Sequence, residues 1–215
     1  MISFCIVSFV LVIDIFCFNR GFYNYEYKDL EVAKDIMVSK SDLNISTDIL
    51  IDYIQDKADN LDFEVEINGT SQEFFTPKDK AHMVDVQKLY LNAKTVQMIA
   101  LAVLIISLIL LKSDKERAFH LYNAYKQLLI FMAIIILASI FYITVDFYAF
   151  WTFFHQIIFD NDLWLLSPLE SNLIKMVPEQ FFNHLVLLIT ISYIFILVIT
   201  YIVLAKIRKR VFLND

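Results

Sequence analysis

The stretch LLIFMAIIILASIFYITV, Leu128–Val145, carries no charged residue and is long enough to cross the hydrocarbon core of a bilayer as one helix. Three further stretches share this character, with Asp14 as their only charge: Ile2–Phe18, Val96–Leu111 and Leu185–Ala205. Backbone polar groups find no water inside a bilayer, so stretches of this kind must be helical. The sequence therefore predicts four transmembrane helices.

The composition agrees with several membrane spans. Of the 215 residues 59% are apolar, the mean hydropathy is +0.60, and there are only 2 Gly and 3 Pro. A soluble domain is nearer half apolar. The net charge is −6 and no basic patch is interleaved with aromatic residues, so nucleic acid is not expected as a partner.

Basic residues next to the apolar stretches predict the orientation, because they mark the cytoplasmic side of a membrane protein. They cluster after the second stretch and after the fourth: Lys112, Lys115, Arg117 and Lys126, then Lys206, Arg208, Lys209 and Arg210. Both termini are therefore expected in the cytoplasm, and the two segments that contain His82 and His155 are expected on the outer side of the membrane.

The first outer segment is expected to fold as a small α+β cap. The alternating run Phe63–Ile67, a turn at Asn68–Gly69 and a return over Thr70–Phe75 predict a hairpin. Helical spacing is present over 30–38 and 48–57, with Ser46 or Thr47 as a possible cap of the latter. Thr76 followed by Pro77 predicts the start of a long helix that continues into the membrane.

The expected fold class is thus an all-α membrane protein, with four transmembrane helices and a small α+β extracytoplasmic cap. The predicted order begins with transmembrane helix 1 at 1–21, the cap at 22–76 and a cap helix continuing into transmembrane helix 2 at 77–112. A cytoplasmic loop at 113–127 leads to transmembrane helix 3 at 128–147 and a second extracytoplasmic segment at 148–184. The chain ends with transmembrane helix 4 at 185–205 and a cytoplasmic tail at 206–215.

Motifs for nucleophilic, phosphate-binding and zinc-protease chemistry are absent from the sequence. It contains no Gly-x-Ser-x-Gly, no phosphate-binding glycine loop, no His-Glu-x-x-His and no cysteine cluster. What remains is His82 and His155, which the predicted topology places on one side of the membrane among aromatic residues. One imidazole can accept a proton while another donates one. A purely structural role for each histidine, and a metal site formed by His82, Asp85 and His155, stay open as alternatives.

Charged residues near the predicted outer surface are candidates for supporting roles. Asp14 lies within the first apolar stretch, where an ionisable side chain is costly and is a candidate functional residue. It could instead pair with Arg20, and Arg20 could contact a lipid phosphate or carbonyl oxygen. Asp85 and Asp146 are candidates to orient an imidazole.

Two motifs resemble the bacterial lipoprotein intramolecular transacylase family, and the resemblance covers nearly the whole chain. The first is Thr76–Val86, containing His82-Met83-x-Asp85-Val86. The second is the spaced set Phe154-His155, Phe159, Trp164, Pro168, Leu173-Ile174, Pro178-Glu179 and Phe181-Phe182.

The resemblance implies an intramolecular O-to-N acyltransferase of Gram-positive bacteria that acts on diacylglyceryl-modified lipoproteins in the cell membrane. The sn-2 acyl chain moves to the α-amine of the N-terminal cysteine, without cofactor, metal or acyl-enzyme. It implies His82 and His155 as the catalytic pair. Our hypothesis is that His155 acts as base and His82 as proton donor or oxyanion partner, or the reverse, with Asp85 or Asp146 orienting. Aromatic side chains are expected to hold the acyl chains and exclude water: Tyr23, Tyr25, Phe147, Phe150, Trp151, Phe154 and Trp164.

Two other classes of protein remain as alternatives. A metal-dependent membrane lipid hydrolase would release free fatty acid and depend on metal. A non-catalytic four-span protein that senses lipid or scaffolds a complex would tolerate substitution of both histidines.

Overall fold

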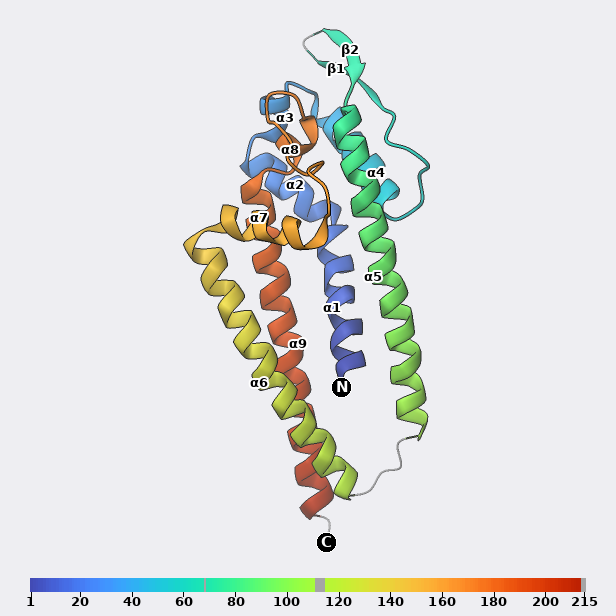
Figure 1. The fold of residues 1–215 in the computed structure, drawn as a ribbon, viewed down its shortest axis with the longest axis vertical. Coiled ribbons are helices and arrows are strands. Elements are labelled where there is room, and N and C mark those ends of the chain that lie inside the picture. Colours follow the sequence, from blue (N-terminus) through green and yellow to red (C-terminus); the bar gives the residue numbers. More distant parts are fainter. Residues whose placement is uncertain (68, 111–114, 214–215) are drawn as a thin grey trace. The chain divides into compact units, whose positions relative to one another are not determined.

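The computed structural model describes the backbone of residues 1–67, 69–110 and 115–213, and the side chains of these residues except 115–118 and 211–213. Its elements, in chain order, are α1 (Ile2–Cys17), α2 (Arg20–Asp29), α3 (Val32–Ile36), α4 (Lys40–Ile54), β1 (Glu64–Ile67), β2 (Thr70–Glu73), α5 (Pro77–Leu110), α6 (Lys115–Val145), α7 (Phe147–Ile158), α8 (Asn172–Met176) and α9 (Glu179–Leu213) (Figure 1). They form two compact units, one made of Met1–Phe16, Lys94–Phe147 and Val186–Asp215, the other of Cys17–Ala93 and Tyr148–Leu185.

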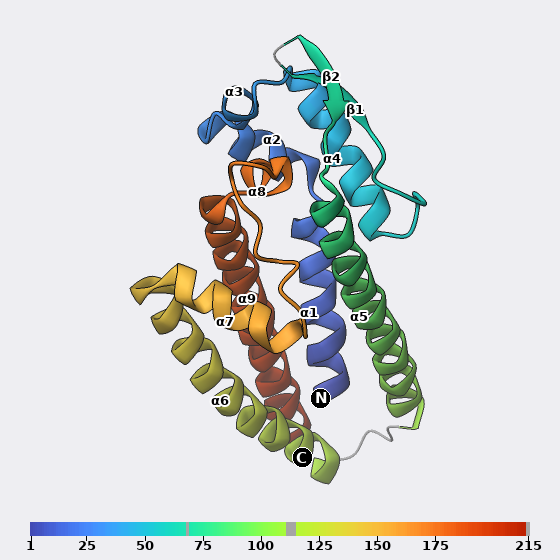
Figure 2. The ribbon, with the colours of Figure 1, turned by 45° about the horizontal axis from the view of Figure 1, so that its top comes forward.

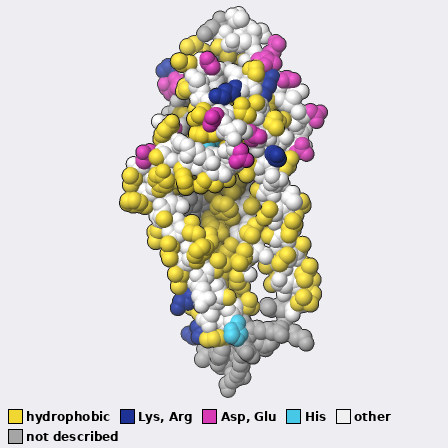
Figure 3. All heavy atoms as spheres, viewed as in Figure 1, with side chains coloured by type: hydrophobic (Ala, Val, Ile, Leu, Met, Phe, Trp, Pro, Cys, Tyr) yellow, Lys and Arg dark blue, Asp and Glu magenta, His cyan; other side chains and the backbone are white. Residues whose placement is uncertain are grey.

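The first unit contains the membrane-spanning segments. Three helices within the described residues are long and apolar enough to cross a bilayer: Pro77–Leu110, Phe119–Val145 and Glu179–Arg210. Their apolar side chains are largely exposed, among them Ile105, Leu108, Leu137, Phe141 and Phe195. Hydrophobic side chains dominate the visible surface of this unit (Figure 3). An apolar exterior of this extent suits hydrocarbon rather than water.

The predicted first span, 1–21, is corrected by the structure. α1 has 16 residues, and a break at Phe18 and Asn19 separates it from α2. The Asn19 side chain accepts a hydrogen bond from the backbone N–H of Phe22, so Asn19 starts a new helix rather than continuing the old one. Among the residues that the structure describes, three helices therefore meet the requirement for a span, and a fourth does so if α1 and α2 are counted as one bent segment.

Only part of α5 is needed to cross the membrane. With 34 residues it is about 51 Å long, whereas the hydrocarbon core is about 30 Å thick. The charged residues of α5 lie from Lys78 to Lys94, so the uncharged part that suits hydrocarbon is 95–110. His82 lies outside this segment, in the part of α5 that belongs to the second unit.

Aromatic side chains hold the interior of the first unit together. Tyr125 of α6 and Tyr193 of α9 are buried beside Cys5 and Leu197. The Tyr125 hydroxyl donates to the backbone oxygen of Leu197 (2.9 Å), and the Tyr193 hydroxyl donates to that of Cys5 (3.2 Å). Each buried hydroxyl therefore has the acceptor that an apolar environment requires.

The alternative pairing of Asp14 with Arg20 is not the one that the structure shows for either residue. The Asp14 carboxylate pairs with the Lys94 ammonium of α5 at 2.6 Å, inside the first unit. In the second unit, Arg20 pairs with Asp48 of α4 at 2.5 Å. The Asp14–Lys94 pair offsets the cost of placing either charge near hydrocarbon, and Lys94 was not singled out from the sequence.

The predicted loop at 113–127 is also corrected. Residues 111–114 lie outside the described part, but α6 already begins at Lys115, so the third span continues a helix that starts before residue 128. The segment KERAFHLYNAYKQ contains no Gly or Pro and is rich in strong helix formers, which favours helix over loop. Similarly, α9 continues to Leu213 through most of the predicted tail.

The second unit contains the predicted hairpin. β1 and β2 pair antiparallel from Glu64↔Glu73 to Ile67↔Thr70. Gly69 has φ +76°, a conformation that glycine adopts without strain, as the predicted turn requires. Asn68, the other predicted turn residue, lies outside the described part. The α+β character predicted for this segment is therefore confirmed.

Helix α4 starts earlier than predicted. Its N-cap is Ser39, whose hydroxyl oxygen accepts from the N–H of Asp42 at 3.0 Å. Ser46 and Thr47, the predicted caps, lie buried within the helix and donate to backbone oxygens of the preceding turn. Hydroxyls in a helix interior are commonly satisfied in this way.

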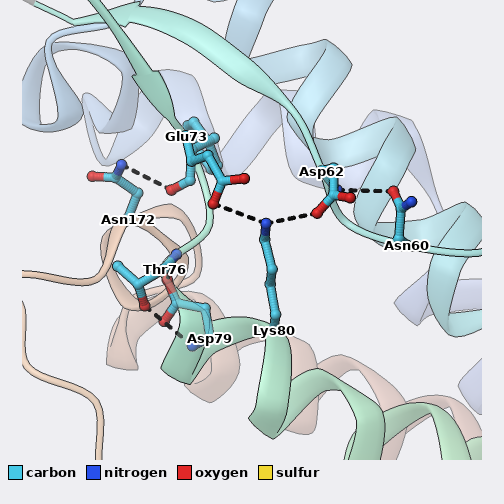
Figure 4. Close-up of polar contacts among 8 residues, drawn as sticks. Asn60, Asp62, Glu73, Thr76, Asp79, Lys80 and Asn172 are labelled. Atoms are coloured by element: carbon cyan, nitrogen blue, oxygen red, sulfur yellow. Dashed lines mark hydrogen bonds and ion pairs between the residues drawn. The ribbon is translucent and has the colours of Figure 1, made fainter.

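The start of α5 is as predicted. The Thr76 hydroxyl oxygen accepts from the Asp79 N–H (3.1 Å), and the Asp79 carboxylate accepts from the Thr76 N–H (2.9 Å). This is a reciprocal capping box, and Figure 4 shows it beside Lys80, which binds Glu73 and Asp62. The hairpin and the chain before it are thereby joined to the first turn of α5.

The second predicted extracytoplasmic segment, 148–184, contains nearly all of α7, the whole of α8 and the start of α9. α8 starts at Asn172 with Ser171 as its cap. The Ser171 hydroxyl also donates to the buried Asp79 carboxylate at 2.6 Å, which joins α8 to the start of α5. α3 and α8, far apart in sequence, lie side by side (Figures 1 and 2).

Candidate active site

His82 occupies the second turn of α5, where the Thr76–Asp79 cap fixes the start of the helix. Its side chain is buried, with 8% of its surface exposed. Met83 beside it is also buried. The position of the imidazole is therefore set by a capped helix start within the second unit.

His155 is presented by α7, a helix with one buried and one exposed side. Tyr148, Phe153 and Ile157 are exposed, whereas His155 is 8% exposed. Its Nδ1 lies 2.7 Å from the backbone oxygen of Trp151. A carbonyl oxygen can only accept, so Nδ1 carries the hydrogen, and in the neutral imidazole Nε2 is left as a proton acceptor.

The structure brings the two histidines together. The ring centroids of His82 and His155 are 6.2 Å apart, with 36° between the ring planes. Phe159 contacts both rings, with centroid distances of 5.4 Å to His82 and 5.7 Å to His155. The juxtaposition predicted from topology is thus present, across 73 positions of sequence, from His82 to His155.

Aromatic side chains enclose His155. Trp164 stacks on it with centroids 4.9 Å apart and 29° between planes. Trp151 and Phe154 meet it edge-on at 4.9 Å and 5.5 Å. Phe182 of α9 in turn stacks on Trp151 at 4.5 Å. Three predicted pocket residues, Trp151, Phe154 and Trp164, therefore lie around the imidazole.

Burial keeps both imidazoles neutral. The pKa of His82 is lowered from 6.5 to about 4, mainly because the ring is removed from water and also because His155 is close, while the negative charge of Asp85 partly opposes the shift. Burial also lowers the pKa of His155, against the hydrogen bond to Trp151. At neutral pH each ring therefore has one acceptor nitrogen and one N–H, and in His155 the N–H is bound by the Trp151 carbonyl oxygen, which leaves Nε2 as the acceptor.

The lowered pKa of His82 predicts a loss of stability in acid. Because the unfolded chain takes up a proton near pH 6.5 and the folded chain only near pH 4, stability is full above pH 6.5 and falls as the pH drops towards 4. The loss from this one group approaches about 3 kcal/mol, at 1.36 kcal/mol per pKa unit. Thermal unfolding in detergent at both ends of this range measures it.

The controls for this prediction are substitutions of two histidines. His82→Gln should lose less stability on acidification than the wild type, and His120→Gln, at an exposed position on α6, should follow the wild type. Equal acid losses in the wild type and in His82→Gln would contradict the assignment.

Asp85 does not orient an imidazole by a hydrogen bond among the described residues. Its Oδ2 accepts from the side-chain amide of Asn161 at 2.9 Å. The described residues also contain no group of three His, Cys, Asp or Glu side chains placed to hold a metal ion. The alternative metal site formed by His82, Asp85 and His155 therefore gains no support from the geometry.

The segment 159–171, here called the strap, connects α7 to α8 and carries Phe159 and Trp164. It is bound to the polar side of α5 at three points. Lys78 Nζ donates to the Leu165 backbone oxygen (2.5 Å), Asn161 donates to Asp85, and Ser171 donates to Asp79. The aromatic cover of the histidines is thus held in place by contacts with the helix that carries His82.

The remaining predicted pocket residues do not all surround the histidines. Tyr23 is buried, but its ring packs on Phe181 (4.9 Å) and its hydroxyl donates to the Cys17 backbone oxygen. Tyr25 is 66% exposed. Phe150 is partly buried on α7.

Two further predicted site residues, Asp146 and Phe147, belong to the first unit, at the junction of α6 and α7. Their functional roles stay predictions.

A hydrogen bond to a buried carboxylate was not predicted from the sequence. The buried Glu26 carboxylate of α2, 2% exposed, lies 2.9 Å from Nδ1 of the more exposed His184 of α9. Phe181, one turn earlier on α9, packs on Tyr23 of α2. No local sequence motif predicts this contact, because Glu26 and His184 are far apart in the chain.

Comparisons with known proteins identify relatives of the chain. A family model described as lipoprotein intramolecular transacylase Lit matches residues 1–182. No curated protein sequence matches the chain significantly.

Solved structures share the fold. The membrane integral lipoprotein intramolecular transacylase Lit from Bacillus cereus has a TM-score of 0.75 and 19% identity, over 97% of this chain and 92% of that one. Two variants of that protein, with one histidine replaced by arginine or by alanine, have TM-scores of 0.73 and 0.72 at 20% identity, over 99% and 97% of this chain and 90% of theirs. Like these relatives, the chain is a membrane protein.

Proposed function

The chain belongs to the lipoprotein intramolecular transacylase family, and from this premise we propose that it moves the sn-2 acyl chain of a diacylglyceryl-modified lipoprotein to the α-amine of the N-terminal cysteine. The observation that carries the proposal is the enclosed pair His82–His155, with ring centroids 6.2 Å apart. A transacylase whose donor and acceptor share one molecule needs proton transfer and positioning but no acyl-enzyme.

Closing a ring of about eight atoms brings the amine to the ester, and holding that geometry is the main task of the site. The α-ammonium loses one proton to Nε2 of His155, and the neutral nitrogen attacks the sn-2 carbonyl carbon. The C–N bond forms, and the C–O bond to glycerol breaks. The proton held by His155 passes to the leaving glyceryl oxygen, and the nitrogen loses a second proton to become an amide. One proton is released overall.

The two histidines have different parts in this proposal. His155 is the base because its Nδ1 is engaged by the Trp151 carbonyl, which leaves Nε2 as the acceptor. His82 supplies an N–H hydrogen bond to the carbonyl oxygen as negative charge develops on it. The lowered pKa of His82, about 4, keeps this imidazole neutral at physiological pH.

The aromatic enclosure supports transfer over hydrolysis. Trp151, Phe154 and Trp164 pack on His155, and Phe159 contacts both imidazoles. Apolar walls of this kind would accommodate acyl chains and keep water from the ester.

We further propose that the site lies at the outer leaflet of the bacterial cytoplasmic membrane, with both termini in the cytoplasm. The basic residues Lys206, Arg208, Lys209 and Arg210 follow the apolar part of α9, and such residues favour the cytoplasmic side. Mature lipoproteins carry their lipidated cysteine at the outer leaflet, where the site would meet it.

Mass spectrometry of a synthetic diacylglyceryl lipopeptide incubated with the protein in nanodiscs tests the function. Transfer leaves the total mass unchanged, so the fragment spectrum must locate the acyl chain on the α-amine. An N-acetylated lipopeptide, which lacks the nucleophile, is the control and should remain unchanged. Release of free fatty acid in place of N-acyl product would instead support a hydrolase, and an unaltered lipopeptide would contradict catalysis.

A further inference from the structure

The Asp85 carboxylate lies one helical turn after His82 on α5, and one of its oxygens is hydrogen-bonded to the strap. On α5 it follows His82 by three positions, so the two side chains share one side of the helix. Asn161 of the strap donates to Oδ2 at 2.9 Å. Within the described residues no donor to Oδ1 is present, and a carboxylate can accept at both oxygens.

The proposed reaction places a positively charged ammonium group in a buried site, where a positive charge is destabilised. An α-amine has a pKa of about 7.7–8.0, so the substrate arrives mainly as an ammonium. Both imidazoles are buried, and burial disfavours any cation beside them. When the proton passes from the ammonium to His155 the positive charge remains in the site, so a nearby anion stabilises the charge both before and after the transfer.

We propose that Asp85, held by Asn161, binds the α-ammonium group of the lipidated cysteine and places its nitrogen beside the histidine pair. This inference rests on the proposed function and deepens it, because it assigns recognition of the acyl acceptor to one side chain. Asp85 is then a substrate-binding residue, not a residue that orients an imidazole.

Other carboxylates of the strap offer matched comparisons. Asp160 and Asp162 flank Asn161 and are exposed. They carry the same charge as Asp85 but do not share its position one helical turn from His82. Replacing Asp162 therefore removes a negative charge from the same region without changing the proposed binding group.

The test measures binding of two ligands that cannot react. Both are dialkylglyceryl ether lipopeptides, one with the α-amine and one with hydrogen in its place, and each displaces a fluorescent lipopeptide from the protein in nanodiscs. The wild type should bind the amine ligand about tenfold more tightly, as expected for a charge-assisted hydrogen bond. Asp85→Asn keeps an acceptor for Asn161 but lacks the charge, so it should bind both ligands equally within about twofold.

Three comparisons complete the experiment. Asp162→Asn should retain the wild-type ratio, Asp85→Glu should recover part of it, and Asn161→Ala should reduce it by a smaller factor than Asp85→Asn. An unchanged ratio in Asp85→Asn, or equal binding of both ligands by the wild type, would overturn the inference. These outcomes are separate from failure of the proposed function, which is seen as absence of acyl migration by the wild type in the fragment spectrum.

Discussion

Replacing His155 with Gln should lower the rate of acyl migration by about 10³-fold, within the range usual for loss of a general base. Gln keeps a planar polar side chain of similar size, but it cannot take a proton at neutral pH. The ammonium then has no acceptor where Nε2 of His155 stood, and the nucleophile is not formed. Single-turnover rates, read from the fragment spectrum of the lipopeptide, measure the loss.

The matched control is His120→Gln, which removes an exposed histidine of α6 in the first unit and should leave the rate within about twofold of the wild type. Thermal unfolding should show that His155→Gln is folded. A folded His155→Gln that retains the wild-type rate would remove His155 from the mechanism, and with it the reasoning from its hydrogen bond to Trp151.

His82 should respond differently, because its proposed part is to donate a hydrogen bond. His82→Gln retains an N–H donor and should keep more activity than His82→Ala, whereas at position 155 the two substitutions should be equally damaging. Loss of one oxyanion donor costs about 10²–10³-fold. If instead His155→Gln kept more activity than His155→Ala, while the two substitutions at position 82 were equally damaging, the roles of the two histidines would be exchanged.

The sequence predicted the parts of this protein that depend on local pattern. The apolar stretches, the Thr76 helix start, and the hairpin with its alternating first strand and its turn each follow from the local sequence. The meeting of His82 and His155 followed from topology, since both were expected on the same side of the membrane.

Tertiary partners were not predictable in the same way. Lys94 is the partner of Asp14, and Asp48 that of Arg20, whereas the sequence offered a pair between Asp14 and Arg20 as one of two interpretations. Asn161, which fixes Asp85, lies in an irregular segment with no periodicity to place it. A charge in the sequence indicates that a partner is needed, whereas the partner itself depends on how distant helices pack.

The error over 113–127 has a related cause. The basic residues near the end of the span were interpreted as evidence for the cytoplasmic side of the membrane and also for a loop. Such residues indicate the side of the membrane but not the secondary structure. Without a Gly or Pro to end it, the helix continues through them from Lys115.

Replacing Trp164 with Ala should lower acyl migration at least tenfold and cause free fatty acid to appear. The Trp164 ring stacks on His155 with centroids 4.9 Å apart, and so covers one face of the proposed base. Without it, water can approach the imidazole and compete with the tethered amine for the ester carbonyl. His155, which deprotonates the amine in the proposed mechanism, could then deprotonate water instead. Hydrolysis of the ester should therefore rise as acyl transfer to the amine falls.

The measurement is the ratio of free fatty acid to N-acyl product, both quantified by mass spectrometry from one reaction. Tyr148→Ala, at an exposed position of α7 on the same unit, is the control and should give the wild-type ratio. The double variant Trp164→Ala with His155→Gln should lose the fatty acid as well, because hydrolysis through the exposed site also needs the base. If Trp164→Ala lowers transfer without releasing fatty acid, the ring serves to position the acyl chains, and exclusion of water must be assigned to other walls of the site.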